Sequence, residues 1–116
     1  MINMKKNKHF FIVKYNPVDD KAYVEVVKGR MSDDGVYGFH YIKVPKLSRW
    51  VCTDIKSGLK VTEQRTIEEC ENYLFLNHDK IEATKQKHLY QFYVDKFNAC
   101  VKEYLMQQEA EKNAGW

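Results

Sequence analysis

The hydrophobic period of the chain changes once, near Thr66, and this switch constrains the fold more than any other feature. Up to Glu63, apolar and polar residues alternate in short runs, which is the period of a β-strand with one buried face. From Thr66 onward, apolar residues recur every three to four positions, as in an amphipathic helix. Strands followed by helices predict an α+β domain with a mostly antiparallel sheet.

Turn residues divide the first part of the chain into five short runs. Pro17 and Pro45 end two of these runs because proline cannot donate a ladder hydrogen bond. Gly58 follows Lys56 and Ser57 and suits the positive φ of a tight hairpin. We therefore expect a five-stranded β-meander, with strands at 9–15, 22–28, 36–44, 49–55 and 59–63.

Two helices are expected after the sheet, and both should cover one of its faces. The first opens on a capping box, in which the Thr66 hydroxyl accepts from the Glu69 amide and Glu69 reaches back; Asn77 ends it. The second repeats the capping pattern at 79–82 and continues to about residue 112 without Pro or Gly. At roughly 50 Å, such a helix would overhang a domain of this size. Either its ends fray, a break near His88 splits it, or it packs on another chain.

The length of 116 residues fits one domain, and no apolar run approaches the ~18 residues that a membrane span requires. The basic start is not followed by the apolar region of a secretory signal, so we expect a cytoplasmic protein. Within a single domain at 1–116, the layout is a flexible basic arm at 1–8, the sheet at 9–63, the helices at 66–112 and a frayed tail at 113–116.

No motif in the sequence predicts catalysis, a cofactor or a metal site. Cys52, Cys70 and Cys100 are widely spaced and lie in apolar surroundings, which indicates reduced core thiols. Cys52 and His40 are both in predicted strands, where neighbouring strands can bring them together. The histidines and cysteines lack the close pairing of a structural zinc site, and no phosphate-binding glycine loop is present. We therefore expect a protein that is not an enzyme, with no catalytic residue, no metal and no cofactor.

Aromatic residues are abundant for so small a chain, with eight Tyr, six Phe and two Trp. Exposed Tyr and Trp on a rigid scaffold are typical of protein interfaces. Alternation places several aromatics on one sheet face, and two further candidates lie at the edge of the apolar arc of the long helix. The predicted interface residues are Tyr37, Phe39, Tyr41 and Trp50 on the sheet, with Tyr90 and Val94 on the helix.

The alternative function is nucleic-acid binding by a basic, aromatic sheet face. The net charge is only +3, but the stretch at 36–65 is basic, whereas the last part of the chain is slightly acidic. Aromatic side chains can stack on bases while lysines neutralise phosphates. The residues expected to contact nucleic acid are Lys43, Lys46, Arg49, Lys56, Lys60 and Arg65.

Together these features predict a small, non-enzymatic protein-binding module. Its size and lack of catalytic motifs are typical of accessory proteins of phages or mobile elements, which bind and inhibit or adapt a larger host machine, such as a host defence system. The partner is either a host protein or a second copy that binds through the long C-terminal helix to form a homodimer. No membrane contact is expected. The sequence leaves open the partner, the oligomeric state, the exposed sheet face, the strand order and the continuity of the long helix.

Overall fold

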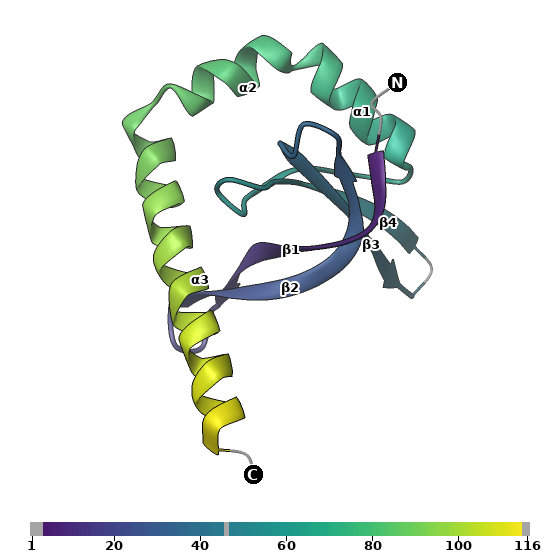
Figure 1. Ribbon diagram of the computed structural model, residues 1–116. Helices are drawn as coiled ribbons and strands as arrows, with labels where there is room; N and C mark the ends of the chain where they lie inside the picture. Colours follow the sequence, from purple (N-terminus) through teal and green to yellow (C-terminus); the bar gives the residue numbers. More distant parts are fainter. Residues whose placement is uncertain (1–3, 46, 115–116) are drawn as a thin grey trace.

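The strands of the sheet pair in the order in which they occur in the sequence (Figure 1). The computed structural model describes residues 4–45 and 47–114. Every neighbouring pair in the five-stranded sheet β1-β2-β3-β4-β5 is antiparallel, so the predicted β-meander followed by helices is confirmed. The elements are β1 Met4–Asn16, β2 Lys21–Ser32, β3 Tyr37–Val44, β4 Leu47–Asp54, β5 Lys60–Gln64, α1 Ile67–Leu76, α2 His78–Lys85 and α3 His88–Ala114.

Strand β1 begins earlier than the alternation predicts. Met4 pairs with Ser32 and packs against the core, and a bulge between Lys5 and Lys8 keeps the strand in register with β2. The expected flexible arm at 1–8 is therefore wrong for residues 4–8, while residues 1–3 lie outside the described part of the chain. The start of this strand is rich in lysine and has no alternating apolar pattern, so the sequence does not reveal it. Backbone pairing with β2 holds it, rather than the burial of one face.

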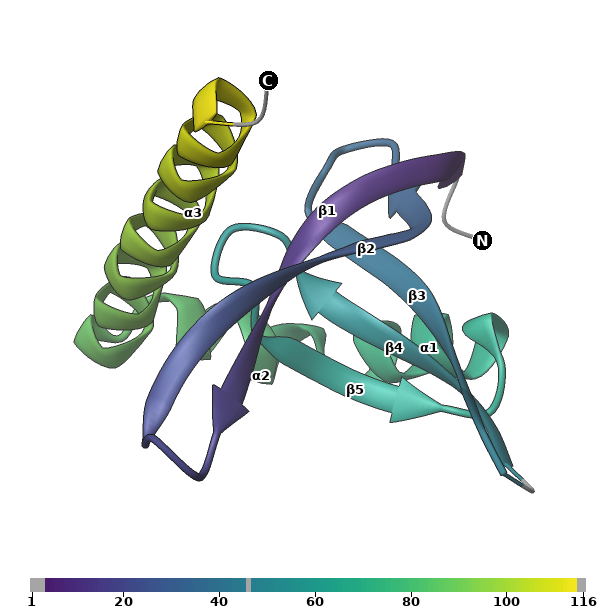
Figure 2. The ribbon, with the colours of Figure 1, turned by 90° about the horizontal axis from the view of Figure 1, so that it is seen from below.

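The sheet is strongly coiled. β2 pairs with β1 along most of its length but with β3 only at Arg30 and Met31. The β1–β2 hairpin consequently runs across the direction of β4 and β5 (Figure 2). The coil brings β1 back to the turn between β4 and β5. There the Val13 amide donates a 3.0 Å hydrogen bond to the carbonyl oxygen of Gly58.

The strand register defines two faces of this sheet. We call the side that carries Phe11 and Phe39 the helix face. There Phe39 and Cys52 pack against Cys70 and Leu74 of α1, and the ring of Phe11 lies edge-on to Tyr104 of α3 at 5.5 Å between centroids. Helices α1 and α3 therefore cover the same face of the sheet, as expected for the predicted helices. The opposite side, which we call the concave face, carries Phe10, Ile12, His40 and Val51, and the coil of the sheet buries these residues.

The β2–β3 turn is held together by hydrogen bonds to the Asp34 carboxylate. One carboxylate oxygen of Asp34, Oδ1, accepts hydrogen bonds from the Ser32 hydroxyl at 2.6 Å and from the Val36 amide at 3.0 Å. The Ser32 oxygen in turn accepts from the Tyr37 amide at 3.0 Å. These hydrogen bonds lower the pKa of Asp34 below its ordinary value, with the Ser32 contact as the main cause.

The helices start and stop close to the predicted residues. The Thr66 hydroxyl accepts from the Glu69 amide at 3.1 Å, while the Glu69 carboxylate accepts from the Arg65 amide instead of completing the capping box. Helix α1 ends before Asn77, as predicted. Asn77 then caps α2 without a side-chain hydrogen bond, so the second capping box, expected at 79–82, does not form.

Of the three alternatives for the long helix, the break near His88 is present. Helix α2 ends at Lys85 and α3 begins at His88, where the chain changes direction (Figure 1). Helix α3 then continues to Ala114, so the expected frayed tail at 113–116 is wrong for 113–114, and 115–116 lie outside the described residues. None of the helices in residues 4–45 and 47–114 is long and apolar enough to cross a membrane.

Candidate functional site

The predicted interface residues separate into buried and accessible ones. Tyr37, Phe39, Tyr41 and Trp50 do share the helix face, as their alternation predicts. Phe39 is 0% exposed beneath α1, and Val94 of α3 is 3% exposed. Both belong to the core of this chain, so assigning them to an interface was wrong. Tyr41, at 47% exposed, is the most accessible member of the sheet set.

Tyr41 and Trp50 form an ordered cluster with a third residue, Arg30. The two aromatic residues are direct cross-strand partners in β3 and β4, and their rings meet edge to face at 5.5 Å between centroids. The Arg30 guanidinium lies 5.4 Å from the centroid of the Trp50 ring. Trp50 is half-buried against the core formed with α1, which fixes the position of the group. We call Arg30, Tyr41 and Trp50 the aromatic–arginine cluster.

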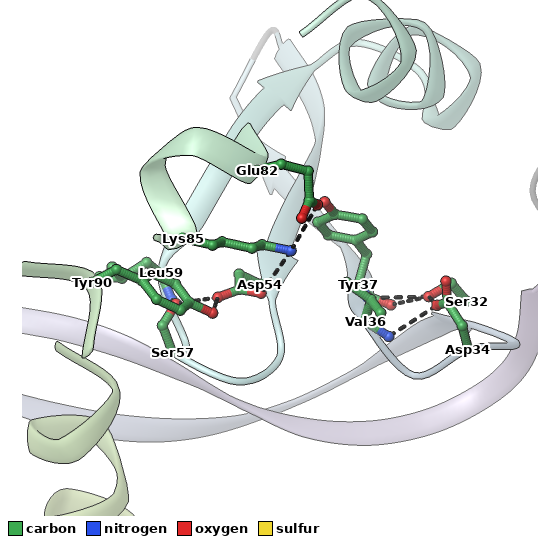
Figure 3. A network of polar contacts seen from close by, with 10 residues as sticks. All are labelled: Ser32, Asp34, Val36, Tyr37, Asp54, Ser57, Leu59, Glu82, Lys85 and Tyr90. Carbon is green, nitrogen blue, oxygen red and sulfur yellow. Dashed lines mark hydrogen bonds and ion pairs between the residues drawn. The ribbon is translucent and has the colours of Figure 1, made fainter. Parts of the chain in front are cut away.

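Tyr90, the other helix candidate, anchors α3 to the sheet (Figure 3). Its hydroxyl donates a 2.7 Å hydrogen bond to Asp54 Oδ2, which also accepts from the Ser57 hydroxyl at 2.6 Å. Asp54 is 5% exposed, and Lys85 Nζ lies 4.0 Å from its other oxygen. Burial, followed by the bond to Asp54, raises the pKa of Tyr90. We call Asp54, Ser57, Lys85 and Tyr90 the Asp54 network.

The break between α2 and α3 allows side chains of both helices to reach the Asp54 carboxylate. In a straight helix, residues five positions apart point about 140° away from each other. Lys85 and Tyr90 nevertheless both reach the Asp54 carboxylate (Figure 3), because the chain turns between them. The Lys85 ammonium also lies 5.0 Å from the centroid of the Tyr37 ring. Tyr37 is half-buried at this junction, and burial raises its pKa.

The basic residues predicted to contact nucleic acid are divided between two faces of the sheet. Lys43 lies on the helix face opposite Ser48, whereas Arg49 lies on the concave face opposite Ile42. Arg49 and Lys60 are both paired with Glu63, at 3.8 and 3.7 Å. Lys56 and Arg65 are exposed, and Lys46 lies outside the described residues. The described members of this set do not form one basic strip beside the aromatic rings.

Two of the three cysteines are core residues, as predicted, and the third is not fully buried. Cys52 and Cys70 are buried free thiols, and Cys100 is half-buried. Burial raises the pKa of Cys52, and it raises the pKa of Cys70 to about 11, so both thiols are protonated at neutral pH. His40 lies on the opposite face of the sheet from Cys52, so the two do not meet. Among the described residues, no group of three His, Cys, Asp or Glu side chains could hold a metal ion.

His40 is a buried imidazole on the concave face. Burial, with a smaller contribution from Lys14, lowers its pKa below the ordinary value of 6.5, while Glu25 and Glu63 act in the opposite direction. The unfolded chain therefore binds more protons than the folded one between the lowered pKa and pH 6.5.

We predict that this difference contributes a loss of stability as the pH falls from about 6.5, because the folded protein resists protonating His40. Replacing His40 by Gln should flatten the pH dependence of the unfolding free energy, measured by urea denaturation in steps from pH 7 to 5. The exposed His88, replaced in the same way, serves as the control and should leave the slope unchanged. An unaltered slope in His40→Gln would contradict the assignment.

No family model, curated protein sequence or solved structure is significantly similar to this chain. The functional argument therefore rests on the chemistry of the surface itself. Two features were beyond the reach of the sequence: Arg30 joins the aromatic pair only through the β2–β3 register, and Asp54 meets Tyr90 only through tertiary packing.

Proposed function

We propose that this protein is a small non-enzymatic protein-binding module whose contact surface is centred on the aromatic–arginine cluster. The observation that carries the proposal is the packing of Tyr41 and Arg30 against Trp50 on the sheet. Trp, Tyr and Arg are the residue types that dominate the energetic centres of protein interfaces. Their mutual contacts already restrict these side chains. Binding a partner therefore costs less of their conformational entropy.

Exposed apolar side chains on the helices support a protein partner further. Phe75 and Leu76 at the end of α1 are exposed, as are Leu89, Phe92 and Tyr93 at the start of α3. The Phe92 and Tyr93 rings meet edge to face at 5.8 Å between centroids. Surfaces that expose large apolar groups are typical of association sites. The partner is a host protein or a second copy that binds through α3.

We also propose a cytoplasmic location and a role as an accessory protein that acts on a larger host machine. Free, buried thiols at Cys52 and Cys70 support a reducing compartment. The role in phage or mobile-element biology follows only from the small size of the chain and from its lack of catalytic motifs.

The experiment that tests protein binding is affinity capture with the tagged protein from a lysate of the source cells, with and without nuclease. The proposal predicts that the same protein partner is recovered in both conditions, because the contact is between proteins. Partners that disappear after nuclease treatment would contradict it and would favour the nucleic-acid alternative. Binding that weakens steeply with salt would point in the same direction.

A further inference from the structure

The coil of the sheet forms a half-open cavity on its concave face. Its volume is about 660 Å³, within the range of small-molecule sites, and it is lined by residues of the five strands and the β4–β5 turn. The aliphatic side chains in the lining are Ile12, Val27, Ile42 and Val51. Tyr41 of the aromatic–arginine cluster also borders this cavity, although its ring belongs to the helix face of the sheet.

Two buried nitrogen atoms on the concave face lack a hydrogen-bond partner: Nδ1 of His40, which lines the cavity, and Nε of Arg49, which lies on the same face. His40 lines the cavity and is 7% exposed. In the register of β3 and β4, His40 is opposite Val51 and Arg49 is opposite Ile42, which makes His40 and Arg49 diagonal neighbours on one face. Buried polar groups are nearly always hydrogen-bonded in native proteins, so an unpartnered pair on one face indicates a missing hydrogen-bond partner.

The charges around the cavity favour an anion, because Lys14, Lys28, Lys43 and Lys60 line it against only Glu25 and Glu63. Lys14 is matched by Glu25 at 3.1 Å. Glu63 is shared between Arg49 and Lys60, at 3.8 and 3.7 Å, so two cations face one carboxylate. The distance from Arg49 Nε to Glu63 is too long for a hydrogen bond, which leaves the Arg49 N–H free to donate.

We propose that the concave cavity binds a small aliphatic carboxylate. The Nε–H of Arg49 and the Nδ1–H of His40 donate to the two carboxylate oxygens, and the hydrocarbon body packs on Ile12, Val27, Ile42 and Val51. The aliphatic part of the lining suits an anion with a hydrocarbon body better than inorganic phosphate. This site does not depend on the proposed protein-binding function.

The test is an NMR titration of methyl-labelled protein with hexanoate, hexanamide and inorganic phosphate. We expect saturable shifts of the methyl groups of Ile12, Val27, Ile42 and Val51 with hexanoate, and at least tenfold weaker binding of hexanamide, which lacks the charge. Phosphate should not move these methyl groups. The comparison of ligands needs no variant and therefore does not depend on how a substitution folds.

Matched substitutions test which residues bind the carboxylate of hexanoate. Arg49→Gln should weaken hexanoate binding at least tenfold, whereas Arg65→Gln, which changes an exposed arginine, should not. His40→Gln is compared with His88→Gln in the same way. The absence of saturable methyl shifts with hexanoate would overturn the proposal. So would equal binding of hexanamide, equal methyl shifts with phosphate, or unchanged affinity in a folded Arg49→Gln variant.

Discussion

Replacing Asp54 by Ala is expected to lower the free energy of unfolding by about 3 kcal/mol. The Asp54 carboxylate accepts hydrogen bonds from the Ser57 and Tyr90 hydroxyls and lies 4.0 Å from the Lys85 ammonium. Alanine would leave two hydroxyl groups without an acceptor, and the Ser57 side chain is almost completely buried. Because the network joins the β4–β5 turn to α2 and α3, the loss should spread to the docking of both helices.

Urea denaturation followed by circular dichroism measures this effect. Asp33→Ala, which changes an exposed acidic residue of the β2–β3 turn, is the matched control and should alter stability by less than ~0.5 kcal/mol. Tyr90→Phe removes only one of the hydrogen bonds and should cost about 1 kcal/mol. If Asp54→Ala were as stable as the Asp33 control, the network would not anchor the helices.

Replacing Gly58 by Ala is expected to destabilise the protein by a similar amount, about 3 kcal/mol. Gly58 has a φ of +71°, which is unfavourable for any residue with a Cβ. A Cβ at this position would also overlap the ring of Phe97, a buried residue of α3. The substitution therefore combines backbone strain with displacement of the helix.

Gly35→Ala separates the two contributions, because Gly35 has a nearly identical φ of +73° but open space around its Cβ position. It should cost only about 1 kcal/mol. Combining Gly58→Ala with Phe97→Leu should give a smaller loss than the sum of the two single changes, since the smaller side chain relieves the overlap. Equal effects of Gly58→Ala and Gly35→Ala would contradict the packing of α3 on this turn.

The order of the elements could be predicted from the sequence because local signals fix it. Alternating residues, prolines and Gly58 mark the strands, and Thr66 and Asn77 mark the ends of α1. The extent of β1 could not be predicted, because pairing with β2 holds residues 4–8 without a local hydrophobic pattern.

The buried face of α3 differs from the predicted apolar arc. Leu89, Phe97 and Leu105 were expected on this arc, but of the three only Phe97 is buried. Val94, expected at the edge of the arc, is buried beside it, since the β4–β5 turn and Asp54 set the rotation of the helix. Helical periodicity indicates that one face is apolar, but only the neighbouring elements decide which of several similar faces becomes buried.

The interface prediction was limited in the same way. Alternation correctly put Phe39, Tyr41 and Trp50 on one face of the sheet, but it could not show that α1 covers Phe39. Arg30 was missed because it lies in another strand and reaches Trp50 only through the coil of the sheet. Pairwise tertiary contacts of this kind leave no periodic signal in a single sequence.

The most direct test of protein binding through the aromatic–arginine cluster compares two exposed tyrosines. Tyr41 is 47% exposed within the cluster, and Tyr23 is 45% exposed on β2, outside it. Each is replaced by Ala, and the affinity for the captured partner is measured by calorimetry with nuclease-treated protein. Tyr41→Ala should weaken binding by about 30-fold, equivalent to ~2 kcal/mol, whereas Tyr23→Ala should bind like the wild type. Wild-type affinity in a folded Tyr41→Ala variant would contradict the account.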